Sequence, residues 1–300
     1  MKCIPKQYTQ REVAWDQYNY SYEFEPLESI PTKTNFNFVH VLPSSKVFED
    51  LDNFVVFQVE FPNCLVAGHL RDIDVFKYDH KIKKIIAHCP FSVEYFNQRF
   101  GYDKFIYGFI PYNPRYVPIH GEKIYDVYHT GHVHNTAIPA AFPIMEKFKN
   151  CIVSCDYGNH RGVGYEEKLA LNAQSKISIC HCLINWPQHY KAGAAQFPGH
   201  GAFELVQEYG MVPQIKTRIF EAVMSKSLIL CLQDPWNVIE SYFEPDKDFI
   251  YWTDIKDLEE KTRHILSHYD DYLPIVENAY NKLVSNFSIR HFFDKYLVNL

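Results

Sequence analysis

Several kinds of protein are excluded by what this sequence lacks. None of its eight cysteines forms a Cys-x-x-Cys pair, and several lie within apolar runs, as buried reduced thiols do. No apolar run is long enough to cross a bilayer, and the first residues lack the apolar region of a secretory signal, so we expect a cytoplasmic chain. The net charge of -6 argues against a nucleic-acid partner, while peripheral contact with a membrane stays open.

What the sequence does contain is an alternation of short apolar strands with helices. The second half alternates throughout, which is typical of a parallel sheet with helices on both faces, and the first half follows the same sense less cleanly. Residues 112–123 hold Pro114, Pro118 and Gly121 and indicate a linker. We therefore predict an α/β protein of two Rossmann-like, doubly wound domains, 1–120 and 121–300, that face a cleft. The last helix is a candidate to pack back on the first domain. Strands are expected at 36–42, 54–60, 84–88, 104–110, 125–130, 151–155, 176–184, 228–232 and 249–252, and helices at 44–52, 93–100, 138–149, 165–174, 258–269, 273–287 and 289–297.

The most informative segment runs from Lys216 to Cys231 and is predicted to form a short helix, a turn and a buried strand. It places Lys216 and Arg218 at a helix start, where the helix dipole disfavours cations. An anion held at that end would make both charges favourable, because the first backbone N–H groups also point at it. Glu221, one turn further on, could accept hydrogen bonds from hydroxyls. The pattern predicts a nucleotide-sugar site, and the alternative is an i,i+3 ion pair between Arg218 and Glu221.

Three segments carry a resemblance to a known family: Tyr-Asp-Val-Tyr-His-Thr-Gly at 125–131, the helix and strand at 165–179, and Arg-Ile-Phe-Glu-Ala at 218–222. The chain resembles GT-B glycosyltransferases of the group-1 superfamily, in the branch similar to spore-coat maturation enzymes. The resemblance implies that Glu221 contacts the donor ribose and that Arg218 contacts the diphosphate, with Lys216 as a second phosphate contact. The chain departs from the family at Pro213, where many relatives carry a second Glu, and at Ser225, where Gly is usual.

The same resemblance implies a nucleotide-sugar donor and a glycan or other hydroxyl acceptor, with no metal and no other cofactor. Two loops at the carboxyl ends of predicted strands add candidates for the donor site. Gly131 would let the backbone approach a ligand, and contacts to the diphosphate or sugar are expected from His132, Asn135, His160 and Arg161. His132 is also a candidate catalytic group.

The acceptor hydroxyl must lose a proton if the reaction inverts, and this requires a base. Glu60, which ends the apolar run 54–60, is the candidate, and His40 and His88 also end apolar runs.

Two other functions stay open. One is a metal-dependent phosphoesterase, because 131–134 and 158–160 match two of its sequence blocks. These blocks occur in reversed order here, and Arg161 stands where an acidic ligand is needed. The other is a non-catalytic nucleotide-sugar-binding protein of the same fold.

Overall fold

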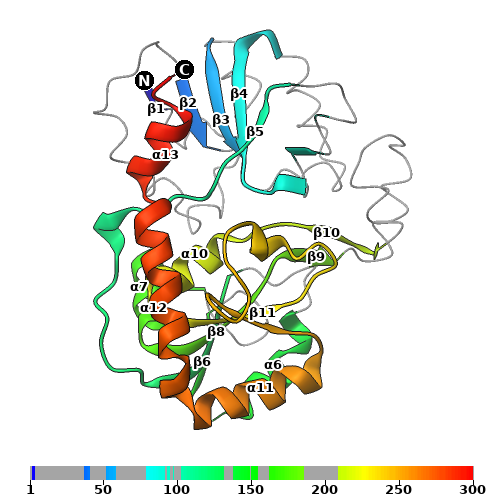
Figure 1. Cartoon of the computed structure of the whole chain (residues 1–300), viewed down its shortest axis with the longest axis vertical. Helices are drawn as coiled ribbons and strands as arrows, with labels where there is room; N and C mark the ends of the chain where they lie inside the picture. Colours follow the sequence, from blue (N-terminus) through cyan, green and yellow to red (C-terminus); the bar gives the residue numbers. More distant parts are fainter. Residues whose placement is uncertain are drawn as a thin grey trace. The chain divides into compact units, whose positions relative to one another are not determined.

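The computed structural model describes residues 2–3, 37–40, 52–58, 79–91, 93–94, 97, 103–131, 138–148, 150–154, 162–185 and 209–299. The chain divides into two compact units. Unit 1 comprises Met1–Pro111, Ile184–Gln214 and Ile289–Leu300, and unit 2 comprises Tyr112–Leu183 and Ile215–Ser288. Each unit contains a five-stranded sheet, drawn with its helices in Figure 1. The prediction of an α/β protein with two Rossmann-like domains is confirmed.

The described strands of unit 1 follow one another across a parallel sheet in chain order. They are β1 (Lys2–Cys3), β2 (Asn37–His40), β3 (Phe54–Gln58), β4 (Ile82–Ala87) and β5 (Phe105–Tyr107). The first four residues of β3 are fully buried, as expected of a strand that is covered on both faces. Helix α13 (Ile289–Tyr296) packs in this unit, with the Phe292 ring edge-on to Phe57 at 5.4 Å and to Phe109 at 5.6 Å.

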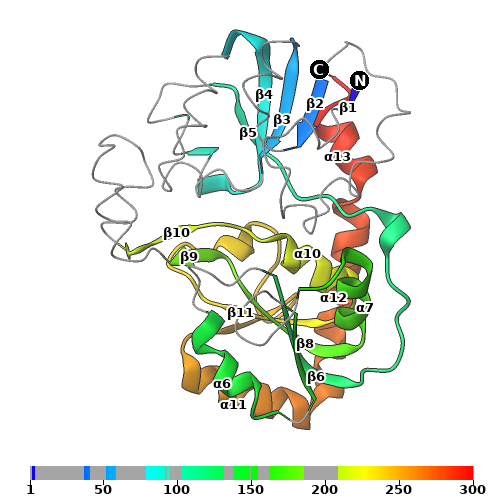
Figure 2. The same cartoon turned by 180° about the vertical axis from the view of Figure 1, so that it is seen from behind.

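Unit 2 is a doubly wound sheet with the strand order β12-β11-β8-β6-β7, and all its pairs are parallel. Among its helices, α10 contacts α7 and α12, and α11 contacts α6 and α12 (Figures 1 and 2). Strand β11, which lies between β12 and β8, is buried along its whole length. The strands are β6 (Tyr125–Thr130), β7 (Cys151–Ser154), β8 (Ser175–His181), β11 (Leu228–Leu232) and β12 (Ile250–Trp252). The helices are α6 (Phe142–Met145), α7 (Tyr165–Ala173), α10 (Thr217–Met224), α11 (Ile255–Ser267) and α12 (Tyr269–Asn286).

Two elements differ from the sequence prediction. The helix expected at 138–149 is a 3₁₀ turn, Ile138–Ala140, followed by the four-residue α6. Pro143 has no N–H to donate to the preceding turn, and it lies in the first turn of α6, where a proline costs a helix least. The connection expected at 185–213 ends in a short strand, β10 (Met211–Pro213), which pairs with β9 (Leu183–Asn185). None of the helices in the described part of the chain is both long and apolar enough to cross a bilayer.

The C-terminal end of α10 is closed by hydrogen bonds from its own chain. Ser227 N donates to Ala222 O and Lys226 N donates to Val223 O, each at 3.0 Å, which is a Schellman motif. Its left-handed residue is Lys226, with φ of 52°. Ser225, where the family resemblance places a glycine, has φ of -87° and needs none. The side chain of Lys123 donates to Lys226 O at 2.7 Å and to the end of α7 at Ala173 O at 2.8 Å.

Candidate functional site

The strand order of unit 2 reverses between β6 and β8. From β6 the chain passes to β7 on one side, then returns across β6 to β8 and continues outward to β11 and β12. At such a point the connections leave the two strands toward opposite faces of the sheet, and ligands bind outside the carboxyl ends. β6 ends at Thr130 and β8 ends at His181. The topology therefore places a candidate ligand site at the carboxyl ends of these two strands.

Arg218, on the first turn of α10, brings a positive charge to this place. The residue is largely buried, with 8% of its surface exposed. Nη1 of its guanidinium donates to Nε2 of His129 at 3.2 Å and to Nε2 of His181 at 3.1 Å. His129 belongs to β6 and His181 to β8, so the guanidinium is tied to both strands that flank the reversal.

Both histidines are neutral, and backbone carbonyls set their tautomers. Nδ1 of His129 lies 2.8 Å from Ile179 O, and Nδ1 of His181 lies 2.9 Å from Leu183 O. A carbonyl oxygen only accepts, so Nδ1 carries the proton in each ring and Nε2 offers its lone pair to Arg218. Burial, with the adjacent Arg218 charge, lowers the pKa of His129 to about 3 and lowers that of His181 well below its usual range.

Gly131, directly after β6, lies beside the Arg218 guanidinium. Gly131 has φ of 99°, a conformation that side chains disfavour. A Cβ at this position would lie 2.7 Å from Nη2 of Arg218. A larger residue would therefore strain the backbone and displace the guanidinium at the same time.

Glu221 faces a different partner, on the neighbouring helix α7. Lys168 Nζ donates to Glu221 Oε1 at 2.6 Å, and both side chains are largely buried. Close by, burial raises the pKa of Tyr128 to about 12, and the Glu221 charge contributes to this shift. The alternative of an intrahelical pair is thus wrong: Arg218 bonds to the histidines and Glu221 pairs with Lys168.

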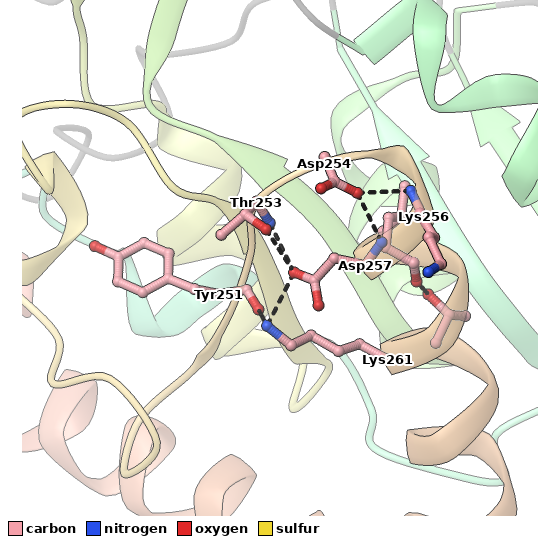
Figure 3. Close-up of polar contacts among 8 residues, drawn as sticks. Tyr251, Thr253, Asp254, Lys256, Asp257 and Lys261 are labelled. Atoms are coloured by element: carbon pink, nitrogen blue, oxygen red, sulfur yellow. Dashed lines mark hydrogen bonds and ion pairs between the residues drawn. The ribbon is translucent and has the colours of Figure 1, made fainter.

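The start of α10 differs from that of α11 in the same unit. At α11 the carboxylate of Asp254 accepts from two backbone N–H groups at 2.9 Å each (Figure 3). Asp257 reaches back to accept from Thr253 N at 2.8 Å and from Lys261 Nζ at 3.0 Å. At α10 the N-cap residue is Lys216, whose side chain has no acceptor with which to cap a helix. The α10 start therefore combines helix N–H groups with cationic side chains, which suits an anionic ligand.

Comparison with known proteins now identifies the family. The family model described as glycosyl transferase-like matches residues 147–297, just over half of the chain. The chain belongs to this glycosyltransferase family. A search of the curated proteins finds no match. The spore-coat branch stays a prediction.

Solved structures show that the family member has the GT-B fold. A TarM variant from S. aureus, in complex with Fondaparinux, alpha-GlcNAc-glycerol and UDP, matches with a TM-score of 0.58 and 11% identity over 92% of this chain and 57% of that one. Sucrose-phosphate synthase from Thermosynechococcus elongatus matches with a TM-score of 0.57 and 8% identity, over 86% of this chain and 70% of that one. The pneumococcal O-GlcNAc transferase GtfA, in complex with UDP and GlcNAc, matches with a TM-score of 0.52 and 10% identity, over 87% of this chain and 55% of that one. The chain thus spans little more than half the length of TarM and GtfA.

The structure brings together only part of the set of site residues predicted for this glycosyltransferase. Gly131, Arg218 and Glu221 lie around the ends of β6 and β8 and the first turns of α10, and Lys216 is the N-cap of that helix. The other predicted site residues lie outside the described residues: Glu60, His132, Asn135, His160 and Arg161. Most of the two sequence blocks behind the phosphoesterase alternative lie outside them as well.

Three residues of the site were not singled out from the sequence: His129 as a partner of Arg218, and His181 and Lys168 altogether. A signal for the histidines was present, because each lies at or next to the carboxyl end of a predicted parallel strand, where ligands bind. Lys168 gave no such signal, since a lysine on a short amphipathic helix usually faces solvent.

Proposed function

We propose that this chain transfers a sugar from a nucleoside-diphosphate sugar to a hydroxyl acceptor such as a glycan. The observation that carries the proposal is the Arg218 guanidinium, held at the ends of β6 and β8 by two neutral imidazoles. Both imidazoles orient the guanidinium without cancelling its charge. Membership of a glycosyltransferase family supports sugar transfer as the reaction.

The leaving diphosphate sets the main electrostatic demand of this reaction. In our proposal Arg218, Lys216 and the first N–H groups of α10 stabilise the negative charge that develops on it. A guanidinium suits this task because it can donate two parallel hydrogen bonds to phosphate oxygens. We propose that these groups act without a bound metal ion.

Glu221 would hold the ribose. Lys168 contacts Oε1 of the carboxylate, and among the described residues no donor contacts Oε2. Oε2 can therefore accept hydrogen bonds from ribose hydroxyls, while the bond from Lys168 holds the carboxylate in place. The general base for the acceptor is proposed to be Glu60, if the reaction inverts.

Ligand binding tests the donor half of the proposal directly. The chain would be unfolded thermally in EDTA with UDP, GDP or ADP, and with the matching nucleosides as controls. One diphosphate should raise Tm well above its nucleoside, since a ligand at a hundred times its Kd stabilises by about 2.7 kcal/mol. UDP is the first probe because the TarM and GtfA structures contain it.

Transfer is tested next, with the sugar conjugates of the stabilising nucleotide and a panel of glycan acceptors, followed by mass spectrometry. Transfer, or slow hydrolysis of the donor, supports the proposal. Stabilisation by Mn²⁺ or Zn²⁺ alone together with phosphoester hydrolysis would replace it with the phosphoesterase. Diphosphate binding with neither transfer nor hydrolysis would leave a binding protein.

A further inference from the structure

Two histidines from separate strands share one nitrogen of the Arg218 guanidinium. Both rings are fully buried, and their centroids are 6.5 Å apart at an interplanar angle of 26°. Each Nε2 receives a hydrogen bond from Nη1, at 3.2 Å and 3.1 Å. An Nη1 group has two hydrogens, so both bonds can be made at once.

Each ring is fixed from behind by a backbone carbonyl. The His129 bond goes to Ile179 O on the neighbouring strand β8, and the His181 bond goes to Leu183 O just beyond its own strand. These bonds decide both the orientation of the rings and which nitrogen accepts. The two rings form a rigid support whose acceptor atoms converge on a single point.

Neutral acceptors have a consequence for the charge that carboxylates would not have. Elsewhere in this chain the arginines of exposed helix faces pair with acids, as Arg263 does with Glu259 at 2.7 Å and Arg290 with Asp294 at 2.8 Å. A carboxylate partner competes with a phosphate for the same guanidinium. An imidazole lone pair holds the guanidinium in place without neutralising its positive charge.

We propose that His129 and His181 are positioning residues, which aim the Arg218 guanidinium at the donor diphosphate through their Nε2 lone pairs. The inference rests on the proposed function of the site. It assigns to both histidines a role in diphosphate affinity that goes beyond filling the space between β6 and β8.

Two substitutions at each position separate this role from simple packing. Gln places an amide oxygen near the position of Nε2 and so keeps the acceptor for Arg218. Asn places an amide nitrogen near the position of Nδ1, which keeps the bond to the carbonyl but removes the acceptor. His129→Gln and His129→Asn, with the same pair at His181, are therefore matched variants. Each would be checked for cooperative thermal unfolding.

The readout is the Kd ratio of nucleoside to nucleoside diphosphate, measured by calorimetry with UDP and uridine, and with the GDP and ADP pairs. Each Asn variant should bind the diphosphate about tenfold more weakly, with nucleoside affinity unchanged, because one hydrogen bond to a charged group is lost. Each Gln variant should stay close to the wild type. Equal losses in the Asn and Gln variants, or equal losses for nucleoside and diphosphate, would overturn the inference.

A spectroscopic measurement tests the arrangement without any ligand. Two-dimensional ¹⁵N NMR of the imidazoles should show both rings neutral near pH 6, with the proton on Nδ1. A proton on Nε2 in either ring contradicts the inference whatever the binding data show. Absence of binding by the wild type to all three diphosphates would instead remove the proposed function, so the two failures are distinguishable.

Discussion

The first turns of α10 and α11 carry side chains of opposite charge beside their backbone N–H groups. Every helix start presents backbone N–H groups with no partner inside the helix. The chain answers this at α11 with Asp254 at the N-cap and Asp257 in the first turn, the arrangement that the helix dipole favours. At α10 it places Lys216 at the N-cap and Arg218 in the first turn, which the dipole disfavours.

The difference separates a start that serves stability from one that we propose serves a ligand. The bonds at α11 are local and contribute to folding whether or not anything binds. At α10 the cation is held by neutral histidines from two strands, and in our proposal a bound diphosphate would stabilise it further. Substitutions at the start of α10 should therefore lower mainly the affinity for the diphosphate, and substitutions at the start of α11 should lower mainly the unfolding free energy.

The largest effect is expected from Arg218→Met, which removes the charge but keeps most of the apolar stem. Affinity for the nucleoside diphosphate that binds the wild type should fall roughly a hundredfold, as expected for loss of charged hydrogen bonds to phosphate. Removal of the buried charge and loss of the donor to Nε2 of His129 and His181 act on the unfolding free energy in opposite directions, so it should change less than the binding free energy. Calorimetry and urea unfolding measure the two quantities. Unchanged diphosphate affinity would contradict the central assignment.

Gly131→Ala should follow in size. The new Cβ meets Arg218 Nη2 at 2.7 Å, and the residue must keep φ of 99°, so unfolding free energy should fall by about 2 kcal/mol and diphosphate affinity should fall with it. Gly121→Ala is the matched control, because a Cβ there meets nothing within 4 Å. Equal effects of the two substitutions on diphosphate affinity would contradict the prediction that a side chain at Gly131 acts by displacing the guanidinium.

Acid should destabilise unit 2 through the two histidines. Between pH 6.5 and about 3 the unfolded chain binds a proton at His129 that the folded chain does not, so the unfolding free energy decreases as pH falls. The slope should be about 1.4 kcal/mol per pH unit for each histidine, and His181 adds to it in the same direction. Urea unfolding at pH 7, 6 and 5 measures it. His129→Gln should remove one histidine's share, and the double Gln variant should remove both.

The smallest effect is expected at α11. Asp254→Ala removes the acceptor of two backbone N–H groups and should lower the unfolding free energy by about 1 kcal/mol. Asp254→Asn keeps an acceptor and should cost less. Diphosphate affinity, measured by calorimetric titration, should match the wild type in both variants. A loss of affinity in either variant would contradict the proposed difference between the starts of α10 and α11.

Local sequence patterns were sufficient for most of the fold of unit 2. The segments predicted as strands at 125–130 and 228–232 are strands with those bounds. Residues 228–232 are an unbroken apolar run, which is typical of a strand covered on both faces of a sheet. The helix predicted at 138–149 was wrong, because the segment begins with a 3₁₀ turn and α6 starts only at Phe142, with Pro143 in its first turn. The strand β10 was missed, since three residues paired with β9 leave no periodic pattern.

Patterns along the chain were enough to predict the doubly wound class, from the alternation of strands and helices, and the α10 segment with Arg218 and Glu221. They also showed that cations stand at a helix start. What holds the two charges depends on residues far away in the sequence. His129 and His181 lie 89 and 37 residues from Arg218, and Lys168 lies 53 residues from Glu221. The histidines meet Arg218 because β6 and β8 become neighbours at the reversal of the sheet, and Lys168 meets Glu221 because α7 packs on α10. No local pattern specifies either pairing.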